Sequence, residues 1–301
     1  MTGAAIQSLP SAIADTTRLA ARLGVPAYEI SSHRFPDGEL RVTVGPAATT
    51  TIIYLSLDQP NDKLLTLVFA AEALRREGAW RLVLVAPYLC YMRQDAAFHP
   101  GEAISQKVVG GMIATAFDRV ITIDAHLHRT RTIAEVFPGI EADNLSAMPA
   151  IADYLHATGF DRNTVVVGPD AESEPWVNDL ASRLGLTHAV ARKTRRSDRS
   201  VEITFADPTL FTGRPALLVD DIVSSGSTLI TCVQALTAAG AGTIDTIITH
   251  ALFPPEMSRD LIGAGIRSIR STNSVPHPTN AIALDAILAN ALRREIAGAL
   301  P

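Results

Sequence analysis

The sequence predicts an α/β protein with two domains, each built on a mainly parallel sheet flanked by helices. Short apolar runs, typical of buried parallel strands, alternate along the chain with helical patterns. The 301 residues are enough to build two separate cores. Acidic residues also follow several of the apolar runs. Ligands bind beyond the carboxyl ends of parallel strands, so we expect the functional groups there.

The alternation can be followed element by element. The expected strands are 51–57, 80–86, 119–123, 164–167, 187–191 and 216–219. The expected helices are 62–77, 104–117, 147–158, 179–184 and 229–239. A boundary near 142–147 divides the chain into an N-terminal domain over 1–145 and a C-terminal domain over 146–301. A last helix over 283–299 is expected to pack back on the first domain.

The composition limits the kinds of partner and the cellular compartment that we expect for this protein. The net charge is −5, from 26 Lys and Arg against 31 Asp and Glu, so the chain has no overall basic field for nucleic acid. We find neither a signal-peptide pattern at residues 1–10 nor an apolar run of about 18 residues, so we expect no membrane partner. Cys90 and Cys232 sit in apolar surroundings, which favours buried free thiols. These features predict a cytoplasmic protein.

The segment 216–229 is the most informative part of the chain. An apolar run leads to Asp220 and Asp221, then to a loop of small hydroxyl residues around Gly226, then to a helical pattern. The first backbone N–H groups of a helix lack internal partners and suit a phosphate. The loop donors are Ser224, Ser225, Gly226, Ser227 and Thr228. The two acids suit hydroxyls or a cation, so the segment predicts a ribose 5-phosphate site. The alternative is a plain N-cap, which Ser and Thr also provide.

Two segments of the first domain have a possible role with a nucleotide. Phe35, in a loop or hairpin with Asp37 and Glu39, could stack on a flat base while a carboxylate accepts from its amino group. The alternative is a turn with a core phenylalanine. Arg93 follows the strand 80–86, where a guanidinium can clamp phosphate oxygens. Its alternative is a structural salt bridge with Asp95.

Three further segments carry charge at strand ends. On an extended segment Asp124, His126 and His128 could share one face, and imidazole near phosphates can ligate a divalent ion. Asp170 ends another strand and could hold a metal directly or through water. Oxygen ligands with phosphates favour magnesium over zinc. Lys193 and Arg195 lie in a charged loop that could form a mobile lid or simply a solvated basic turn.

Together these segments resemble the ribose-phosphate pyrophosphokinase (PRPP synthetase) family, which has the type I phosphoribosyltransferase fold. The matching motifs, in the family's order, are F-P-D-G-E (35–39), P-Y-L-C-Y-M-R-Q-D (87–95), D-A-H (124–126), P-D-A (169–171), K-T-R (193–195) and V-D-D-I-V-S-S-G-S-T (219–228). The segment F-H-P-G-E-A-I-S (98–105) is closer to the archaeal-type branch. Both domains are therefore expected to be phosphoribosyltransferase-like.

The resemblance implies Mg²⁺-dependent transfer of the β,γ-pyrophosphoryl group of ATP to the C1 hydroxyl of ribose 5-phosphate. It implies ATP binding by Phe35, Asp37, Glu39, Arg93, Gln94 and His126. It implies catalytic roles for Lys193 and Arg195, and metal binding by His126 and Asp170. Ribose 5-phosphate would be held by Asp220, Asp221 and the loop 224–228.

Two other classes of function stay open at this point. A base phosphoribosyltransferase that consumes PRPP would share the loop 219–228 but would not need the Arg93 and Lys193 segments. A non-catalytic homologue that regulates an active enzyme is the second, although every matched catalytic position is intact here. We also expect a homo-oligomer, from dimer to hexamer, because symmetric assemblies are common among soluble enzymes.

Overall fold

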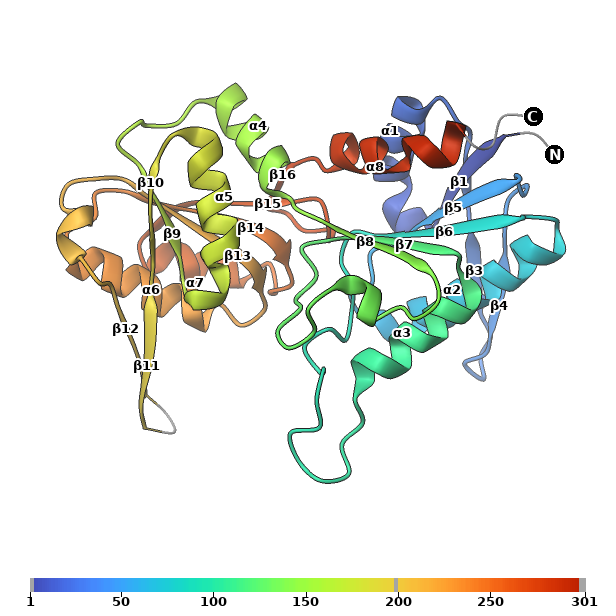
Figure 1. Ribbon diagram of the computed structural model, residues 1–301, viewed down its shortest axis with the longest axis horizontal. Helices are drawn as coiled ribbons and strands as arrows, with labels where there is room; N and C mark the ends of the chain where they lie inside the picture. Colours follow the sequence, from blue (N-terminus) through green and yellow to red (C-terminus); the bar gives the residue numbers. More distant parts are fainter. Residues whose placement is uncertain (1–2, 198–199, 298–301) are drawn as a thin grey trace. The chain divides into compact units, whose positions relative to one another are not determined.

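Two six-stranded sheets form the centre of the structure, one in each of two units (Figure 1). The computed structural model describes residues 3–197 and 200–297, and for 194–197 and 200–202 it describes the backbone only. The first unit holds the described residues up to Leu145 together with the last helix, and the second is Ser146–Leu284. Helices cover both sheets, so the predicted α/β class is confirmed.

The sheet of the first unit is parallel at each of its strand pairings. Its order is β2-β1-β5-β6-β7-β8. The strands are β1 (Ala4–Ser8), β2 (Ala27–Glu29), β5 (Thr50–Tyr54), β6 (Arg81–Ala86), β7 (Arg119–Ile123) and β8 (Glu141–Leu145). In β6 the run R-L-V-L-V-A is buried from its second residue onward, as a central strand covered on both faces requires.

Helices cover both faces of this sheet (Figure 1). On one face α1 packs against the C-terminal helix α8, and on the other lie α2 and α3. The helices are α1 (Ile13–Leu23), α2 (Pro60–Arg76), α3 (Ser105–Ala116) and α8 (Asp285–Ala297), with short 3₁₀ turns η1 (Pro10–Ala12) and η2 (Ile133–Glu135). A small antiparallel hairpin, β3 (Ser31–Arg34) with β4 (Leu40–Thr43), follows β2.

A buried carboxylate ties α8 to the first sheet. Glu295, whose side chain is 3% exposed, accepts hydrogen bonds from Arg81 Nε at 2.5 Å and Arg119 Nη1 at 2.9 Å. Burial acts to raise the pKa of Glu295, but the hydrogen bonds and charges of the two arginines outweigh it, and the pKa is lowered. Arg22 of α1 pairs with Asp285 at the start of α8. The last helix is therefore part of the first unit.

The sheet of the second unit is also parallel at each of its pairings. Its order is β10-β9-β13-β14-β15-β16. The strands are β9 (Val165–Gly168), β10 (Thr187–Val190), β13 (Ala216–Val223), β14 (Ile244–Ala251), β15 (Ile266–Thr272) and β16 (Asn280–Ile282). Helices α4 and α5 lie on one face, and α6 and α7 on the other (Figure 1). Their bounds are α4 (Met148–Thr158), α5 (Glu174–Leu184), α6 (Ser227–Ala238) and α7 (Met257–Gly263).

A second hairpin leaves this unit between β10 and β13. Its strands are β11 (Arg192–Ser197) and β12 (Ser200–Thr204), and it extends away from the body of its unit (Figure 1). Two 3₁₀ turns, η3 (Ala171–Ser173) and η4 (Pro208–Phe211), complete the unit. The sequence predicts a charged loop over this hairpin, whereas the structure has two paired strands there.

Other expected elements differ from the structure mainly at their ends. The expected helix 179–184 starts earlier, at Glu174, where Pro175 occupies the first turn, a position at which proline costs no helical hydrogen bond. Strands β1, β14 and β15 have no counterpart among the strands expected from the sequence. Cys90 and Cys232 are buried free thiols, and burial is the main reason that the pKa of each rises to about 12.

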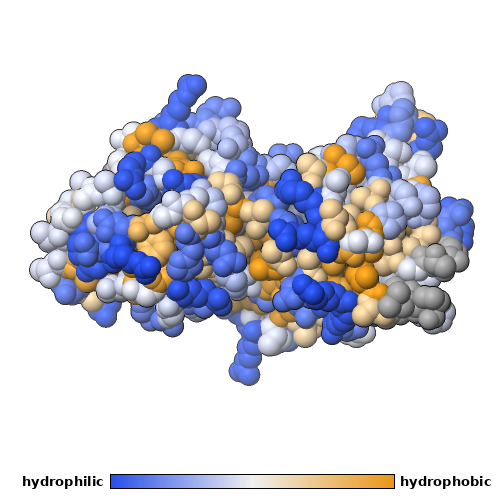
Figure 2. Space-filling view, turned by 90° about the horizontal axis from the view of Figure 1, so that it is seen from above, coloured by the Kyte–Doolittle hydropathy of each residue, from blue (hydrophilic) through white to orange (hydrophobic). Residues whose placement is uncertain are grey.

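Hydrophilic and hydrophobic residues are interspersed on the face shown in Figure 2. Exposed large apolar side chains include Trp80 and Val108, which are 83% and 66% exposed. In the part of the chain that the structure describes, no helix has both the length and the apolar character to cross a membrane.

Candidate active site

The predicted phosphate loop forms the turn between β13 and α6. Gly226 is the residue before the helix and has φ of 66°, a conformation that L side chains rarely adopt. A Cβ at this position would lie 2.8 Å from Met257 Sδ on α7, so the conformation favours glycine and a larger residue would have to displace the methionine side chain. The hydroxyls of Ser225 and Ser227 are 3.1 Å apart at the mouth of the turn. The loop therefore offers the start of a twelve-residue helix, with hydroxyl donors beside it.

The acidic pair lies within β13 rather than after it. The strand continues through Asp220 and Asp221 to Val223, because β13 keeps pairing with β14 as far as Ala251. Asp221 is only 8% exposed, and its carboxylate accepts from the N–H of Ile222 at 2.8 Å. The side chain of Asp220 also contacts that of Asp221, so the two carboxyl groups lie close together.

Asp170 joins this acidic group from the neighbouring strand. It follows β9, which pairs in parallel with β13, and its carboxylate accepts from the N–H of Glu172 at 3.1 Å. Burial, then the charges of Asp221 and Asp170, raise the pKa of Asp220 well above its ordinary value. Three carboxylates thus gather beside the phosphate loop, and such a group favours a cation or hydroxyl donors as its partner.

The turn after β9 is built around a tight contact. A Cβ at Gly168 would lie 2.0 Å from Ser173 Oγ, and this hydroxyl donates to the backbone oxygen of Asp170 at 2.5 Å. Glu172 and Glu174 flank the serine. The compact 3₁₀ turn that results fixes the backbone of Asp170 at the end of the strand.

A polar network missed by the sequence reasoning lies on the next strand, β14. His250 is 1% exposed, and its partner in β13 is Ile222. Ser274 Oγ donates its only hydrogen to the oxygen of Thr249 at 2.7 Å, so it must accept from His250 Nδ1, 2.8 Å away. This places a proton on Nδ1 of His250. Most residues around this histidine in β14 are apolar, so the sequence gives no sign of its polar contacts.

The hairpin β11–β12 carries the two predicted catalytic cations. Lys193 is exposed and pairs with Ile203, which is 6% exposed and packs on the core of the unit. The backbone of Arg195 pairs with that of Val201, while the side chain of Arg195 lies outside the described residues. The root of the hairpin is fixed because Ala191 donates to Gly168 at 2.9 Å.

The predicted adenine segment is the tip of the β3–β4 hairpin. Phe35 is 37% exposed, so the structure does not support the alternative of a core phenylalanine. Its backbone N–H bonds to the oxygen of Glu39 at 2.8 Å, and Asp37 accepts from the N–H of Glu39 at 3.1 Å. His33 lies edge-on to the Phe35 ring at 4.9 Å between centroids. The tip presents an exposed aromatic ring, with Arg41 5.9 Å from its centroid, and two carboxylates follow the ring in the same turn.

The loops after β6 and β7 carry the remaining predicted ATP residues. Arg93 is exposed, and Gln94 Nε2 donates within its own loop, to Ala96 O at 3.1 Å and Glu102 Oε2 at 3.3 Å. The alternative for Arg93 is a salt bridge with Asp95, but the structure pairs Asp95 Oδ1 with Arg129 Nη1 at 2.9 Å.

The segment after β7 departs from the expected extended geometry. Asp124 has φ of 36° and is 3% exposed, so it does not continue the alternation of the strand. His126 is half-buried, and its ring lies edge-on to that of the exposed His128 at 6.1 Å. The two histidines therefore come together, while Asp124 turns into the protein.

Backbone strain in the first unit concentrates at strand ends. Gln59, Tyr91 and Asp124 have φ of 46°, 62° and 36°, and they follow β5, β6 and β7. Non-glycine residues persist in this conformation only where the surroundings hold them there, which is a feature of functional sites. The strain thus marks the same sheet edge as the predicted ATP residues.

The described part of the chain offers no complete metal cage. Among the described residues, no group of three or more His, Cys, Asp or Glu side chains is arranged to hold a metal ion. His126 lies in the first unit and Asp170 in the second. Magnesium usually keeps several waters and binds one or two carboxylates plus substrate phosphates, so the acidic group around Asp220 fits it without such a cage.

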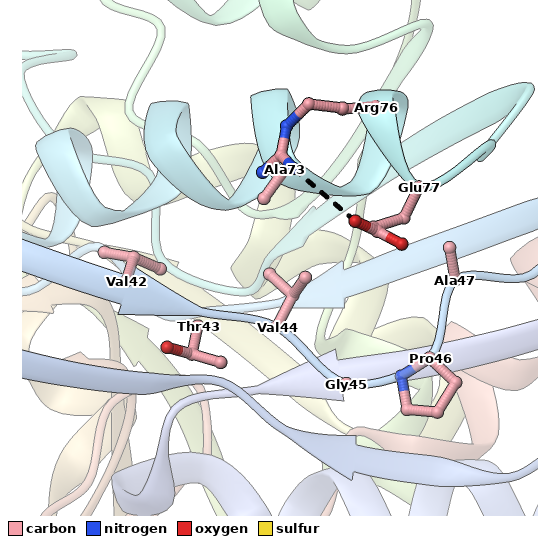
Figure 3. Close-up of a pocket in the computed structure, with 9 residues that line it drawn as sticks. All are labelled: Val42, Thr43, Val44, Gly45, Pro46, Ala47, Ala73, Arg76 and Glu77. Carbon is pink, nitrogen blue, oxygen red and sulfur yellow. Dashed lines mark ion pairs between the residues drawn. The ribbon is translucent and has the colours of Figure 1, made fainter.

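A surface pocket in the first unit lies apart from these residues. It has a volume of about 640 Å³ and opens between β4, the segment after it and the end of α2 (Figure 3). Its walls are mostly apolar, and Arg76 Nη1 pairs with Glu77 Oε1 at its rim at 3.5 Å. The lining residues are Val42, Thr43, Val44, Gly45, Pro46, Ala47, Ala73, Arg76 and Glu77. This list includes none of the predicted site residues.

Comparisons with known proteins agree on one family. Residues 4–116 match the model of the N-terminal domain of ribose phosphate pyrophosphokinase, and residues 144–274 match that of the phosphoribosyl transferase domain. The chain is 32% identical to the ribose-phosphate pyrophosphokinase of Methanopyrus kandleri, over 91% of this chain and 94% of the relative. It is 30% identical to that of Methanosarcina acetivorans, over 92% and 95% of the two chains.

A solved structure shares the whole fold. Phosphoribosylpyrophosphate synthetase from Mycobacterium smegmatis superposes with a TM-score of 0.83 at 24% identity, covering 98% of this chain and 99% of that one. At this identity the likeness shows the architecture, including both units.

Proposed function

This chain belongs to the ribose-phosphate pyrophosphokinase family, and we propose that its first unit binds ATP and its second binds ribose 5-phosphate. The reaction transfers the β,γ-pyrophosphoryl group of ATP to the C1 hydroxyl of ribose 5-phosphate and gives PRPP and AMP. The observation that supports the proposal is the β13–α6 turn, where a helix start suited to phosphate lies beside three carboxylates.

In the second unit, the loop holds the acceptor sugar. Ser224, Ser225, Gly226, Ser227 and Thr228 bind the 5-phosphate through backbone N–H groups and hydroxyls. Asp220 and Asp221 accept hydrogen bonds from the ribose hydroxyls. The raised pKa of Asp220 supports this, because a buried acidic group gains from hydroxyl donors or a cation brought by the substrate.

In the first unit, the hairpin tip and the strand-end loops hold ATP. The exposed ring of Phe35 stacks on adenine, with Asp37 and Glu39 accepting from the base. Three side chains at the ends of β6 and β7 contact the ATP phosphates or the metal: Arg93, Gln94 and His126. Gln94 must exchange its present contacts with Ala96 and Glu102 to reach a phosphate.

Lys193 and Arg195 stabilise the negative charge that develops on the transferring group. Pyrophosphoryl transfer depends mainly on positioning and charge neutralisation, so preorganised cations contribute most of the catalysis. The hairpin geometry supports this role, because the exposed Lys193 is attached through Ile203 to the core of the unit.

Mg²⁺ completes the proposed site. The residues proposed to bind Mg²⁺ together with substrate phosphates are His126, after β7 in the first unit, and Asp170, after β9 in the second. Bound Mg²⁺ neutralises phosphate charge during transfer.

We also propose that the enzyme works in the cytoplasm as a homo-oligomer, from dimer to hexamer. The two buried free thiols support a reducing compartment. Exposed apolar side chains on neighbouring helices, Leu65 and Phe69 of α2 and Val108 of α3, support an assembly because they gain from leaving water. Light scattering after size-exclusion chromatography measures the oligomer size.

One assay tests the proposed activity. Purified protein is incubated with ATP, Mg²⁺ and ribose 5-phosphate, and AMP and PRPP are measured. Equal amounts of both products are expected. Absence of AMP above background would favour the non-catalytic homologue. Consumption of added PRPP with a purine or pyrimidine base would instead favour the phosphoribosyltransferase.

A further inference from the structure

A network of hydrogen bonds ties the loop after β6 to the loop after β7. Asp95 in the first loop has a side chain that is 1% exposed. Its Oδ1 accepts from Arg129 Nη1 at 2.9 Å, and its Oδ2 accepts from the backbone N–H of Arg129 at 3.0 Å. A buried carboxylate is costly without partners, so this contact strongly favours one arrangement of the two loops.

A second connection runs through Gln106, at the start of α3. This side chain is 3% exposed, and its Oε1 accepts from Thr130 Oγ1 at 2.9 Å. On the other side its Nε2 donates to the oxygen of Met92 at 3.4 Å, and its backbone N–H donates to the oxygen of Gln94 at 3.2 Å. The two carbonyls belong to the residues on either side of Arg93.

The network thus holds the backbone on both sides of an exposed arginine. Tyr91, two residues before Arg93, has φ of 62°. A non-glycine residue keeps this conformation only when the surrounding structure imposes it. Arg129 also lies over the ring of Phe98, 5.1 Å from its centroid, which connects the pair to the rest of the long loop before α3.

We propose that Asp95, Arg129 and Gln106 are positioning residues that hold Arg93 where it can contact the phosphates of ATP. The inference rests on the proposed ATP role of Arg93. None of the three needs to touch the substrate. Their effect should be on ATP, since their contacts run between the two loops that carry Arg93 and His126.

The test compares Arg129→Met and Gln106→Met with the parent enzyme in steady-state kinetics. Gln106→Met keeps the side-chain length and Arg129→Met keeps most of the aliphatic stem. Both remove the side-chain hydrogen bonds, while the backbone bonds from residue 129 to Asp95 and from residue 106 to Gln94 remain. A displacement of about 1 Å can cost up to about 100-fold in rate, so we expect kcat/KM for ATP to fall about 10- to 100-fold. The KM for ribose 5-phosphate should stay within about twofold, because the contacts that are removed run between the loops after β6 and β7, which are proposed to hold ATP.

Three further variants make the outcome decisive. Arg131→Met, two residues along the same loop, makes the same charge change and should leave both kinetic constants unaltered. Arg129→Lys keeps the charge near Asp95 and should recover part of the loss, although lysine lacks the planar guanidinium. Arg93→Met tests the premise: if it leaves kcat/KM for ATP unaltered, the proposed ATP role of Arg93 fails.

The positioning role is overturned if Arg93→Met lowers kcat/KM for ATP while Arg129→Met and Gln106→Met do not. It is also overturned if these two variants lower kcat/KM equally for both substrates. A third contrary outcome is a loss of activity that parallels a fall in melting temperature, with the same fall in Arg129→Lys. Loss confined to ATP, at a melting temperature close to that of the parent, supports it.

Discussion

The two regions that we propose bind ribose 5-phosphate and ATP are built in different ways. The ribose 5-phosphate region is nearly continuous in sequence: one strand, one turn and one helix supply the acids, the hydroxyls and the backbone N–H groups over 220–228. The ATP region takes its residues from a hairpin at Phe35 and from two loops near Arg93 and His126. Secondary structure holds the ribose 5-phosphate region, whereas hydrogen bonds between loops hold the part of the ATP region near Arg93 and His126.

This contrast predicts different responses to substitution. A continuous strand-to-helix turn has few alternative conformations, so it fails only where its special backbone or its packing is attacked. Loops joined by side chains depend on each contact, because their backbone has no ladder to hold it. Substitutions that act on one region and leave the other unaltered therefore test whether the division is real.

The largest effect is expected from Lys193→Ala. Removing a preorganised charge at the transferring group should lower kcat about 100- to 1,000-fold. Binding of ribose 5-phosphate, measured by calorimetry, should be retained because the loop 224–228 is intact. Arg192→Ala is the matched control, since the neighbouring residue of β11 points to the opposite face of the strand. Near-normal turnover in Lys193→Ala would remove this residue from the mechanism.

Gly226→Ala should break the continuous region. The added Cβ would lie 2.8 Å from Met257 Sδ, and the backbone of the alanine would have to adopt φ of 66°. We expect kcat/KM for ribose 5-phosphate to fall roughly 10- to 100-fold, as for a misplaced binding group, with little change for ATP. Gly213→Ala is the control, because φ there is 69° and no atom lies within 4 Å of the new Cβ. If both variants lost the same activity, backbone strain alone would explain the result.

Phe35→Ala should affect only the ATP region. Stacking of a base on an aromatic ring contributes about 1–3 kcal/mol, so the KM for ATP should rise roughly tenfold. Trp80→Ala, at a side chain that is 83% exposed in the same unit, controls for loss of an exposed aromatic ring. An unaltered KM for ATP would show that the hairpin tip does not hold the base.

The same contrast explains how far the sequence could predict the structure. The run from Ala216 to Thr228 carries its own periodicity, turn and helix start, so strand, loop and helix follow from local rules. The pairing of Asp95 with Arg129 does not, because it joins residues 34 positions apart and depends on the ends of two parallel strands meeting.

Polar residues inside strands are the second reason why the sequence did not predict every strand and its bounds. Strand β1 is buried throughout but contains Gln7 and Ser8, so its pattern is not that of an apolar run. The amide of Gln7 bonds to the backbone of Gly45 and Pro46, contacts that no local pattern shows. Likewise the acids of β13 are inside the strand because pairing with β14 outweighs their low strand preference.

Glu295→Gln should have the smallest effect on activity, because Glu295 bonds to Arg81 and Arg119, which are not among the residues proposed to bind substrate. It should nevertheless lower the free energy of unfolding by about 1–3 kcal/mol, since Arg81 and Arg119 lose a charged acceptor. The pKa of Glu295 is lower in the folded chain than its ordinary value of 4.5, so its stabilisation is present above that pH and is lost as the pH falls through the folded pKa.

Urea unfolding at a series of pH values measures this. The difference between the parent and Glu295→Gln should be largest near neutral pH and should narrow below pH 4.5. Glu72→Gln is the control, because its pair with Arg76 on α2 is exposed and contributes little. A difference that did not vary with pH would mean that the charge of Glu295 does not stabilise the first unit. Unaltered KM values for both substrates would confine α8 to a structural role.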